Sequence, residues 1–130
     1  MGAMREILFR GRRSWGNKDW VEGDLLHGYS DHVSITKRLI GIETWQVEPE
    51  TVGQYTGLCD KNGKKIFEGD IIEGDLDDNL DPGAKWRSEV VWGKFGWMCK
   101  SRQTLSMDEY DIYEGEVIGN IHDNPKLVEG

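Results

Sequence analysis

The acidic stretch Asp75–Asp81 is the part of the chain whose side chains most resemble a metal site. Alternating carboxylate and amide oxygens open the Ca²⁺-binding loop of helix–loop–helix proteins, which then needs glycine at its sixth position and glutamate at its twelfth. Leu80 and Trp86 stand at those positions. We therefore expect a solvated acidic loop over residues 75–85, with calcium binding as the minor alternative, and we predict no cofactor.

Side chains for nucleophilic or acid–base catalysis show no recognisable arrangement. His27, His32 and His122 are scattered, and the chain has neither a Gly-x-Ser-x-Gly elbow nor a glycine-rich phosphate loop. Cys59 and Cys99 form no Cys-x-x-Cys pair, and in a reducing cytosol we expect both to be free thiols. We therefore expect no enzymatic activity.

Basic side chains form two local groups, one near the amino terminus and one in the middle of the chain. Trp15 and Trp20 stand close to the first group, and a mixture of positive charge with aromatic rings is used to stack single-stranded bases. Charged hairpin tips and buried tryptophans are the competing, purely structural explanation. The candidate nucleic-acid contacts are Arg10, Arg12, Arg13, Lys61, Lys64 and Lys65.

The composition indicates an acidic globular protein. The net charge of −8 repels nucleic acid and anionic membranes overall. Six Trp, four Tyr and three Phe supply bulky core material, which disordered chains lack. No apolar run approaches the roughly 18 residues of a membrane span, and the amino terminus shows no signal core. We expect a cytoplasmic protein whose natural first residue is Met4, with residues 1–3 as a remnant of cloning.

Short apolar runs separated by glycines predict many short β-strands. Strands are expected at Trp20–Leu26, at Thr44–Val47 and, as a closing strand, at Val117–Ile121. Helical turns are expected at Glu48–Val52, which has Pro in its first turn, and at Ser106–Glu109, which has a capping-box spacing.

The middle of the chain carries the firmest turn signals. Asn62-Gly63 predicts a two-residue hairpin turn, and Gly69 predicts a bend within a strand over Ile66–Ile72. Gly93-Lys94 predicts a second hairpin. Asp70 is expected to accept hydrogen bonds from nearby backbone N–H groups. The residues expected to serve the fold are Gly57, Asn62, Gly63, Gly69, Asp70, Gly119 and Asn120.

Four stretches resemble the YopX-like proteins of bacteriophages and prophages: Met4–Gly11, Trp20–Gly23, Val52–Ile72 and Glu116–Leu127. The third is long and specific. The resemblance implies an origin in a phage or prophage, hence the cytoplasm of a bacterial host, and is compatible with a homo-oligomer. It implies no activity and supplies no catalytic residue.

These observations predict one mainly β domain over residues 4–130. Residues 54–122 are expected to form a small, strongly bent, barrel-like part, residues 4–52 to add amino-terminal strands, and residues 123–130 to form a tail. For function we expect a non-enzymatic accessory protein that binds another protein or itself. The alternative is a nucleic-acid-associated accessory protein that uses its basic hairpin tips.

Overall fold

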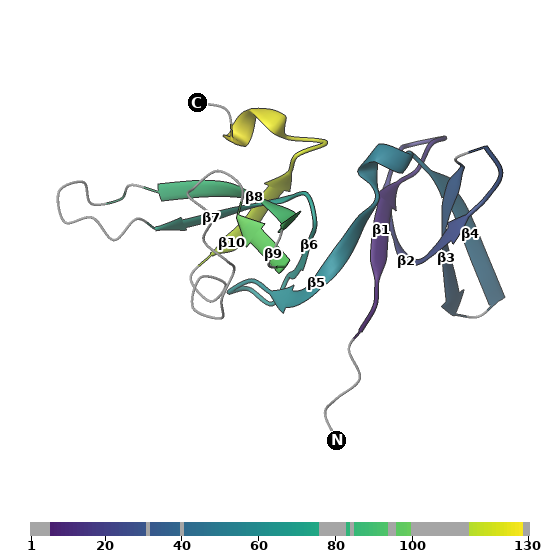
Figure 1. Ribbon diagram of the computed structural model, residues 1–130, viewed down its shortest axis with the longest axis horizontal. Coiled ribbons are helices and arrows are strands. Elements are labelled where there is room, and N and C mark those ends of the chain that lie inside the picture. The colour runs from purple at the N-terminus through teal and green to yellow at the C-terminus, as the bar shows by residue number, and fades with distance from the viewer. Residues whose placement is uncertain are drawn as a thin grey trace, which may run out of the picture. The chain divides into compact units, whose positions relative to one another are not determined.

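The computed structural model describes residues 6–30, 32–39, 41–75, 83, 85–93, 96–99 and 115–128. Ten β-strands and two short 3-10 helices lie within these residues, so the prediction of a mainly β fold is confirmed (Figure 1). The chain divides into two compact units, residues 1–57 and 58–130. Neither of the two helices within the described residues has the length and hydropathy of a membrane-spanning segment.

The first four strands of the chain form an antiparallel meander, and the fifth strand returns to pair with the free side of the first. The hydrogen-bonded order is β4-β3-β2-β1-β5-β6, and strand β5 continues across the boundary between the units. The elements are β1 (Phe9–Arg12), β2 (Trp20–His27), β3 (Val33–Leu39), β4 (Gly41–Val47), the 3-10 helix η1 (Pro49–Thr51) and β5 (Gly53–Cys59).

One face of this sheet holds the apolar side chains. Leu25, Ile35 and Trp45 are directly opposite one another on β2, β3 and β4, so they share that face. Ile35 and Val47 are fully buried on it. We call this face of the first unit the inner face.

Two glycines on the inner face allow the sheet to coil tightly. A Cβ atom on Gly23 would lie 2.2 Å from the carbonyl oxygen of Thr36, and one on Gly11 would lie 2.8 Å from the Val47 side chain. At the end of the sheet, Ser14 N–H donates to the Gln46 carbonyl at 3.0 Å, beside an isolated bridge between Arg13 and Val47. The meander therefore curls until the chain after β1 meets the end of β4.

The helical turn predicted at Glu48–Val52 is present as η1, with Pro49 in its first turn. Thr51 is buried there, and its hydroxyl donates to the Glu48 carbonyl at 2.6 Å while accepting from Arg12 N–H at 2.9 Å. This side chain joins η1 to β1.

The second unit contains a four-stranded antiparallel sheet in the order β10-β7-β8-β9. Its core is formed by Ile66, Ile72 and Val90, against which Trp86 and Trp97 pack. The elements are β6 (Lys65–Phe67), β7 (Asp70–Asp75), β8 (Lys85–Gly93), β9 (Gly96–Cys99), β10 (Glu116–Asn120) and the 3-10 helix η2 (Pro125–Val128) in the tail.

Two details of the middle segment differ from the prediction. The run Ile66–Ile72 is not one strand, because Gly69 has a φ of +90° and turns the chain between β6 and β7. Since β6 lies at the edge of the first sheet and β7 in the second, the described strands form two open sheets, and the predicted barrel for residues 54–122 does not close.

The hairpin between β5 and β6 does not have the predicted two-residue Asn62-Gly63 turn. Gly63 N–H donates to the Asp60 carbonyl and Asp60 N–H donates to the Lys64 carbonyl, so three residues form the loop. Gly63 has a φ of +82°, as expected for the bulge that follows a type I turn. The Asp60 side chain selects this geometry by accepting from the N–H groups of Asn62 and Lys64.

The other predicted elements are either present or lie outside the described residues. The strands at Trp20–Leu26 and at the chain end are present as β2 and β10, and β8 and β9 form the hairpin expected around Gly93. The predicted helical turn at Ser106–Glu109 lies outside the described residues, as does most of the acidic loop over residues 75–85.

Candidate interaction surface

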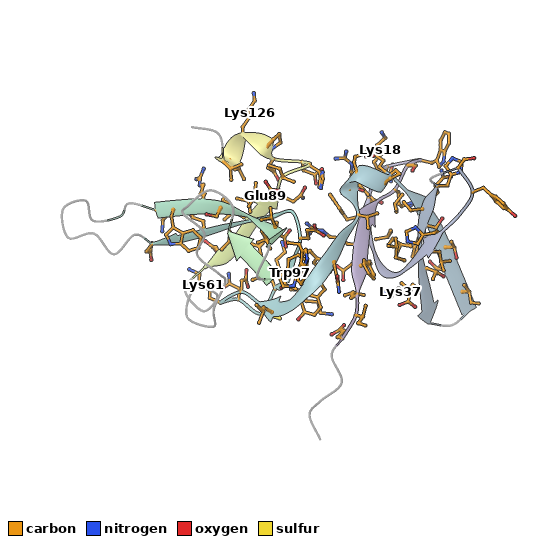
Figure 2. The ribbon with its side chains drawn as sticks, viewed as in Figure 1. Lys18, Lys37, Lys61, Glu89, Trp97 and Lys126 are labelled. Carbon is orange, nitrogen blue, oxygen red and sulfur yellow. The ribbon has the colours of Figure 1, made fainter. Side chains whose placement is uncertain are left out.

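Several large apolar side chains of the first unit are exposed to solvent. Tyr29 is 92% exposed at the tip of the β2–β3 hairpin, Trp15 is 72% exposed between β1 and β2, and Ile42 is 70% exposed on β4. Ile7 and Leu26 are also exposed. Among the described residues of the second unit, Trp92 alone matches this exposure, so exposed apolar surface concentrates in the first unit. Figure 2 draws the side chains of both units as sticks.

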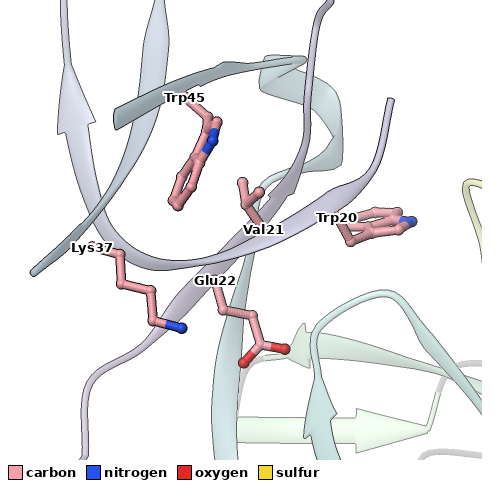
Figure 3. A pocket seen from close by; sticks show the side chains of 5 residues that line it. All are labelled: Trp20, Val21, Glu22, Lys37 and Trp45. Atoms are coloured by element: carbon pink, nitrogen blue, oxygen red, sulfur yellow. The ribbon is translucent and has the colours of Figure 1, made fainter. Parts of the chain in front are cut away.

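An open hollow of about 340 Å³ lies on the first unit. The side chains that line it come from three consecutive strands (Figure 3). Val21, Lys37 and Trp45 belong to the inner face, and Trp20 and Glu22 alternate to the other side of β2.

The hollow combines aromatic surface with one charge of each sign. Trp45 is half-buried, whereas Lys37 and Glu22 are exposed. Lys37 is directly opposite Glu43 on β4, and neither forms an ion pair with another described residue within 4.0 Å. Such a site suits an apolar side chain that has a polar or charged neighbour.

Trp20 also contacts the first basic group. The Arg10 guanidinium lies over its ring, 4.8 Å from the centroid, an arrangement that stabilises the cation on the π face. Arg12 is directly opposite Trp20 on β1. Trp20 is therefore held on the outer side of the sheet between two arginines, and its Arg10-covered face is not open to a nucleic-acid base.

Arg12 is neutralised by Glu48. Its Nη2 and Nε atoms both donate to Glu48 Oε2, at 2.8 and 3.0 Å, and Lys18 Nζ donates to Glu48 Oε1 at 3.1 Å. The hydrogen bond from Arg12, followed by that from Lys18, lowers the pKa of Glu48. Of the three arginines predicted to contact nucleic acid, one is thus an ion-pair partner and one stacks on tryptophan.

The second basic group surrounds a buried carboxylate. Lys61 and Lys64 are exposed at the β5–β6 tip, and Lys65 is half-buried. Asp60, at the start of the same turn, is only 5% exposed. Its carboxylate accepts three backbone hydrogen bonds, from Asn62, Lys64 and Val117, the last of which lies at the start of β10. This role of Asp60 has no recognisable signal in the sequence, because its third partner is 57 positions away.

The other residues expected to serve the fold lie at buried positions, close backbone contacts or turns. Asp70 is buried and accepts from Phe67 N–H at 2.7 Å. A Cβ atom on Gly119 would lie 2.5 Å from Asn124 Oδ1. Asn120 Oδ1 accepts from the N–H groups of His122 and Asp123, which fixes the turn after β10. Gly57 has a φ of +89° within β5.

Two acidic residues of the second unit, Asp75 and Glu73, form ion pairs with basic side chains. The hydrogen bond between Asp75 and Lys85 lowers the pKa of Asp75 and raises the pKa of Lys85. Glu73 forms an ion pair with Arg87, with an N–O distance of 2.7 Å. Within the described ranges, no three His, Cys, Asp or Glu side chains gather as metal ligands would. Residues 76–82 of the calcium-like stretch lie outside those ranges.

Charge is divided unequally between the units. The first has seven Lys and Arg against eight Asp and Glu, a formal charge of −1, whereas the second has nine against sixteen, a charge of −7. An anionic partner is therefore repelled mainly by the second unit, and the first is close to neutral.

With the β-rich fold and this surface defined, the sequence can be placed among known proteins. A family model described as "YopX protein" matches residues 13–129, so the chain belongs to the YopX family. The crystal structure of protein EF1440 from Enterococcus faecalis has the same fold, with a TM-score of 0.63 and 24% identity over 97% of this chain and 100% of that chain. No curated protein matches the sequence.

Proposed function

We propose that this YopX-family chain is a non-enzymatic accessory protein of a phage or prophage, and that it binds a protein through its first unit in the host cytoplasm. The exposure of Trp15, Tyr29 and Ile42 carries this proposal. Exposed apolar side chains of this size on one unit are typical of protein-binding surfaces. The partner is another protein or a second copy of the chain.

The charge distribution supports the same unit. The second unit has a formal charge of −7, so two copies of the chain that met through it would repel each other. A contact through the first unit, which is nearly neutral, avoids this repulsion. The hollow beside Trp45 supplies a place where one apolar side chain of a partner can be anchored.

Paired serine substitutions test this proposal. The full chain would be studied by size-exclusion chromatography with light scattering across salt concentrations, and by affinity capture from induced host cells. We expect Trp15→Ser with Tyr29→Ser to lose the bound protein or the self-association, since both side chains are exposed and contribute little to folding. The matched control is Trp92→Ser, an exposed tryptophan of the second unit. A chain that binds no protein, or equal binding by both variants, overturns the proposal.

The alternative, a nucleic-acid-associated accessory protein, is favoured by the exposure of Lys61 and Lys64 at one hairpin tip. It requires salt-dependent retention of a fluorescent single-stranded oligonucleotide that Lys61→Ala with Lys64→Ala abolishes. Retention that survives both substitutions, or no retention at low salt, rejects it.

A further inference from the structure

Strand β4 differs from the other strands at sheet edges among the described residues. Strand β6 has three residues, β9 has four, and β10 has five with a register shift between Val117 and Gly119. Strand β4 has seven residues and pairs with β3 without any shift. It contains neither proline nor lysine, the residues that commonly prevent an edge from pairing.

The outer edge of β4 is only partly covered. The Gln46 carbonyl accepts from Ser14 N–H, and Glu48 N–H donates to the Arg12 carbonyl. Backbone groups of alternate residues point to the same edge of a strand, so the N–H and C=O groups of Ile42 and Thr44 also face outward. No strand of the described residues pairs with that side of Gly41–Trp45.

The side chains along this edge specify what an added strand must carry. Lys37 and Glu43 are directly opposite on the inner face, so a basic side chain next to Glu43 would continue a row of alternating charge. Trp45 is two residues further along the same face, where it favours an apolar neighbour. Ile42 and Thr44 lie on the other face and suit β-branched partners.

Resting on the proposed function, we propose that β4 is the docking edge, and that its partner is an extended protein segment in which a basic residue alternates with apolar residues on one face. Backbone hydrogen bonds to Ile42 and Thr44 hold the segment, and Glu43 with Trp45 selects its side chains. Two copies paired through β4 about an axis at Glu43 would instead bring like charges together.

Two labelled peptides test the proposal by fluorescence anisotropy on the full chain. The first is Thr-Val-Thr-Lys-Thr-Val-Thr, and the second has Glu in place of Lys. We expect the lysine peptide to bind about threefold to tenfold more tightly. The Glu43→Lys variant should reverse this preference.

Proline at the edge supplies the backbone test. Ile42→Pro removes an outward N–H without removing a hydrogen bond to β3, and it should abolish binding of the lysine peptide. The matched control Ile42→Thr keeps the N–H and should retain binding. Melting temperatures would verify that the variants are folded.

Three results overturn the inference: no binding at about 1 mM peptide, equal binding of both peptides, or unchanged binding by Ile42→Pro. The inference is also overturned if the chain binds neither peptide but forms a dimer that Ile42→Pro dissociates. That result would assign the β4 edge to a second copy of the chain. If neither peptide binds but Trp15→Ser with Tyr29→Ser still loses a bound protein, the inference about the β4 edge is wrong and the proposed function is supported.

Discussion

The Asp60 carboxylate accepts a hydrogen bond from Val117 N–H at 2.8 Å and so joins the β5–β6 turn to the first residues of β10. The same turn is tied to β10 by Lys61 N–H, which donates to the Gly115 carbonyl at 3.1 Å. Two segments that are distant in the sequence are thus held together by one buried side chain and the backbone beside it.

Replacing Asp60 with Asn should destabilise the protein. The amide has one acceptor oxygen, so its NH₂ group would face a backbone N–H that the carboxylate now satisfies. We expect a loss of about 1–3 kcal/mol in the free energy of unfolding, measured by urea denaturation. Asp24→Asn, at an exposed position on β2, is the control and should change little. Equal stability of the two variants would contradict the role of Asp60.

Gly23→Ala should be more harmful than a surface glycine substitution. The new Cβ would lie 2.2 Å from a backbone carbonyl oxygen that cannot move without distorting β3. We expect a loss of about 1–3 kcal/mol in a thermal melt. The control is Gly28→Ala, whose Cβ would lie 3.4 Å from its nearest atom. A Gly23→Ala melting temperature equal to that of the control would argue against close strand contact.

The hydroxyl group of Thr51 should contribute more to the stability of the protein than the shape of its side chain. Thr51→Val removes the acceptor of Arg12 N–H and the donor to the Glu48 carbonyl. The expected loss is about 1–3 kcal/mol by chemical denaturation. Thr51→Ser keeps the hydroxyl and should recover most of that loss. A Thr51→Val variant as stable as the wild type would contradict this role of the hydroxyl.

Glu48 should make stability depend on acid pH. Its pKa is lowered in the folded chain, chiefly by the hydrogen bond from Arg12. Its contribution is therefore fully present above the ordinary glutamate pKa, about 4.3, and is lost as the pH falls through the lower folded value. The melting-temperature difference between wild type and Glu48→Gln should shrink over that window. Glu50→Gln, at an exposed neighbouring position, is the control variant. A melting-temperature difference for Glu48→Gln that does not change with pH would contradict the ion pair.

The local features of the fold followed from the sequence. Pro49 in the first turn of η1, the turn at Gly63 and the bend at Gly69 depend on the preferences of single residues, and each occurs where the chain predicts a turn. Strand pairing beyond the local hairpins could not be predicted from the sequence. That β6 and β7 lie in different sheets depends on long-range pairing, which a bend at Gly69 permits but does not specify.

The candidate surface was predicted less well than the fold. Trp15 stands out in the sequence, but the sequence does not show that its side chain is exposed in the segment between β1 and β2. Arg12 looked like a candidate for nucleic-acid contact because Glu48, which neutralises it, is 36 positions away. The hollow beside Trp45 gathers side chains from three strands and has no local sequence signal.

The proposed function requires that the first unit makes the protein contact. Amide hydrogen exchange of the full chain, free and in complex with a protein that it captures, tests this most directly. The predicted result is slower exchange at Ile42 and Thr44 and around Tyr29, with no change at the Asp60–Lys64 turn. Protection confined to the second unit would contradict the claim.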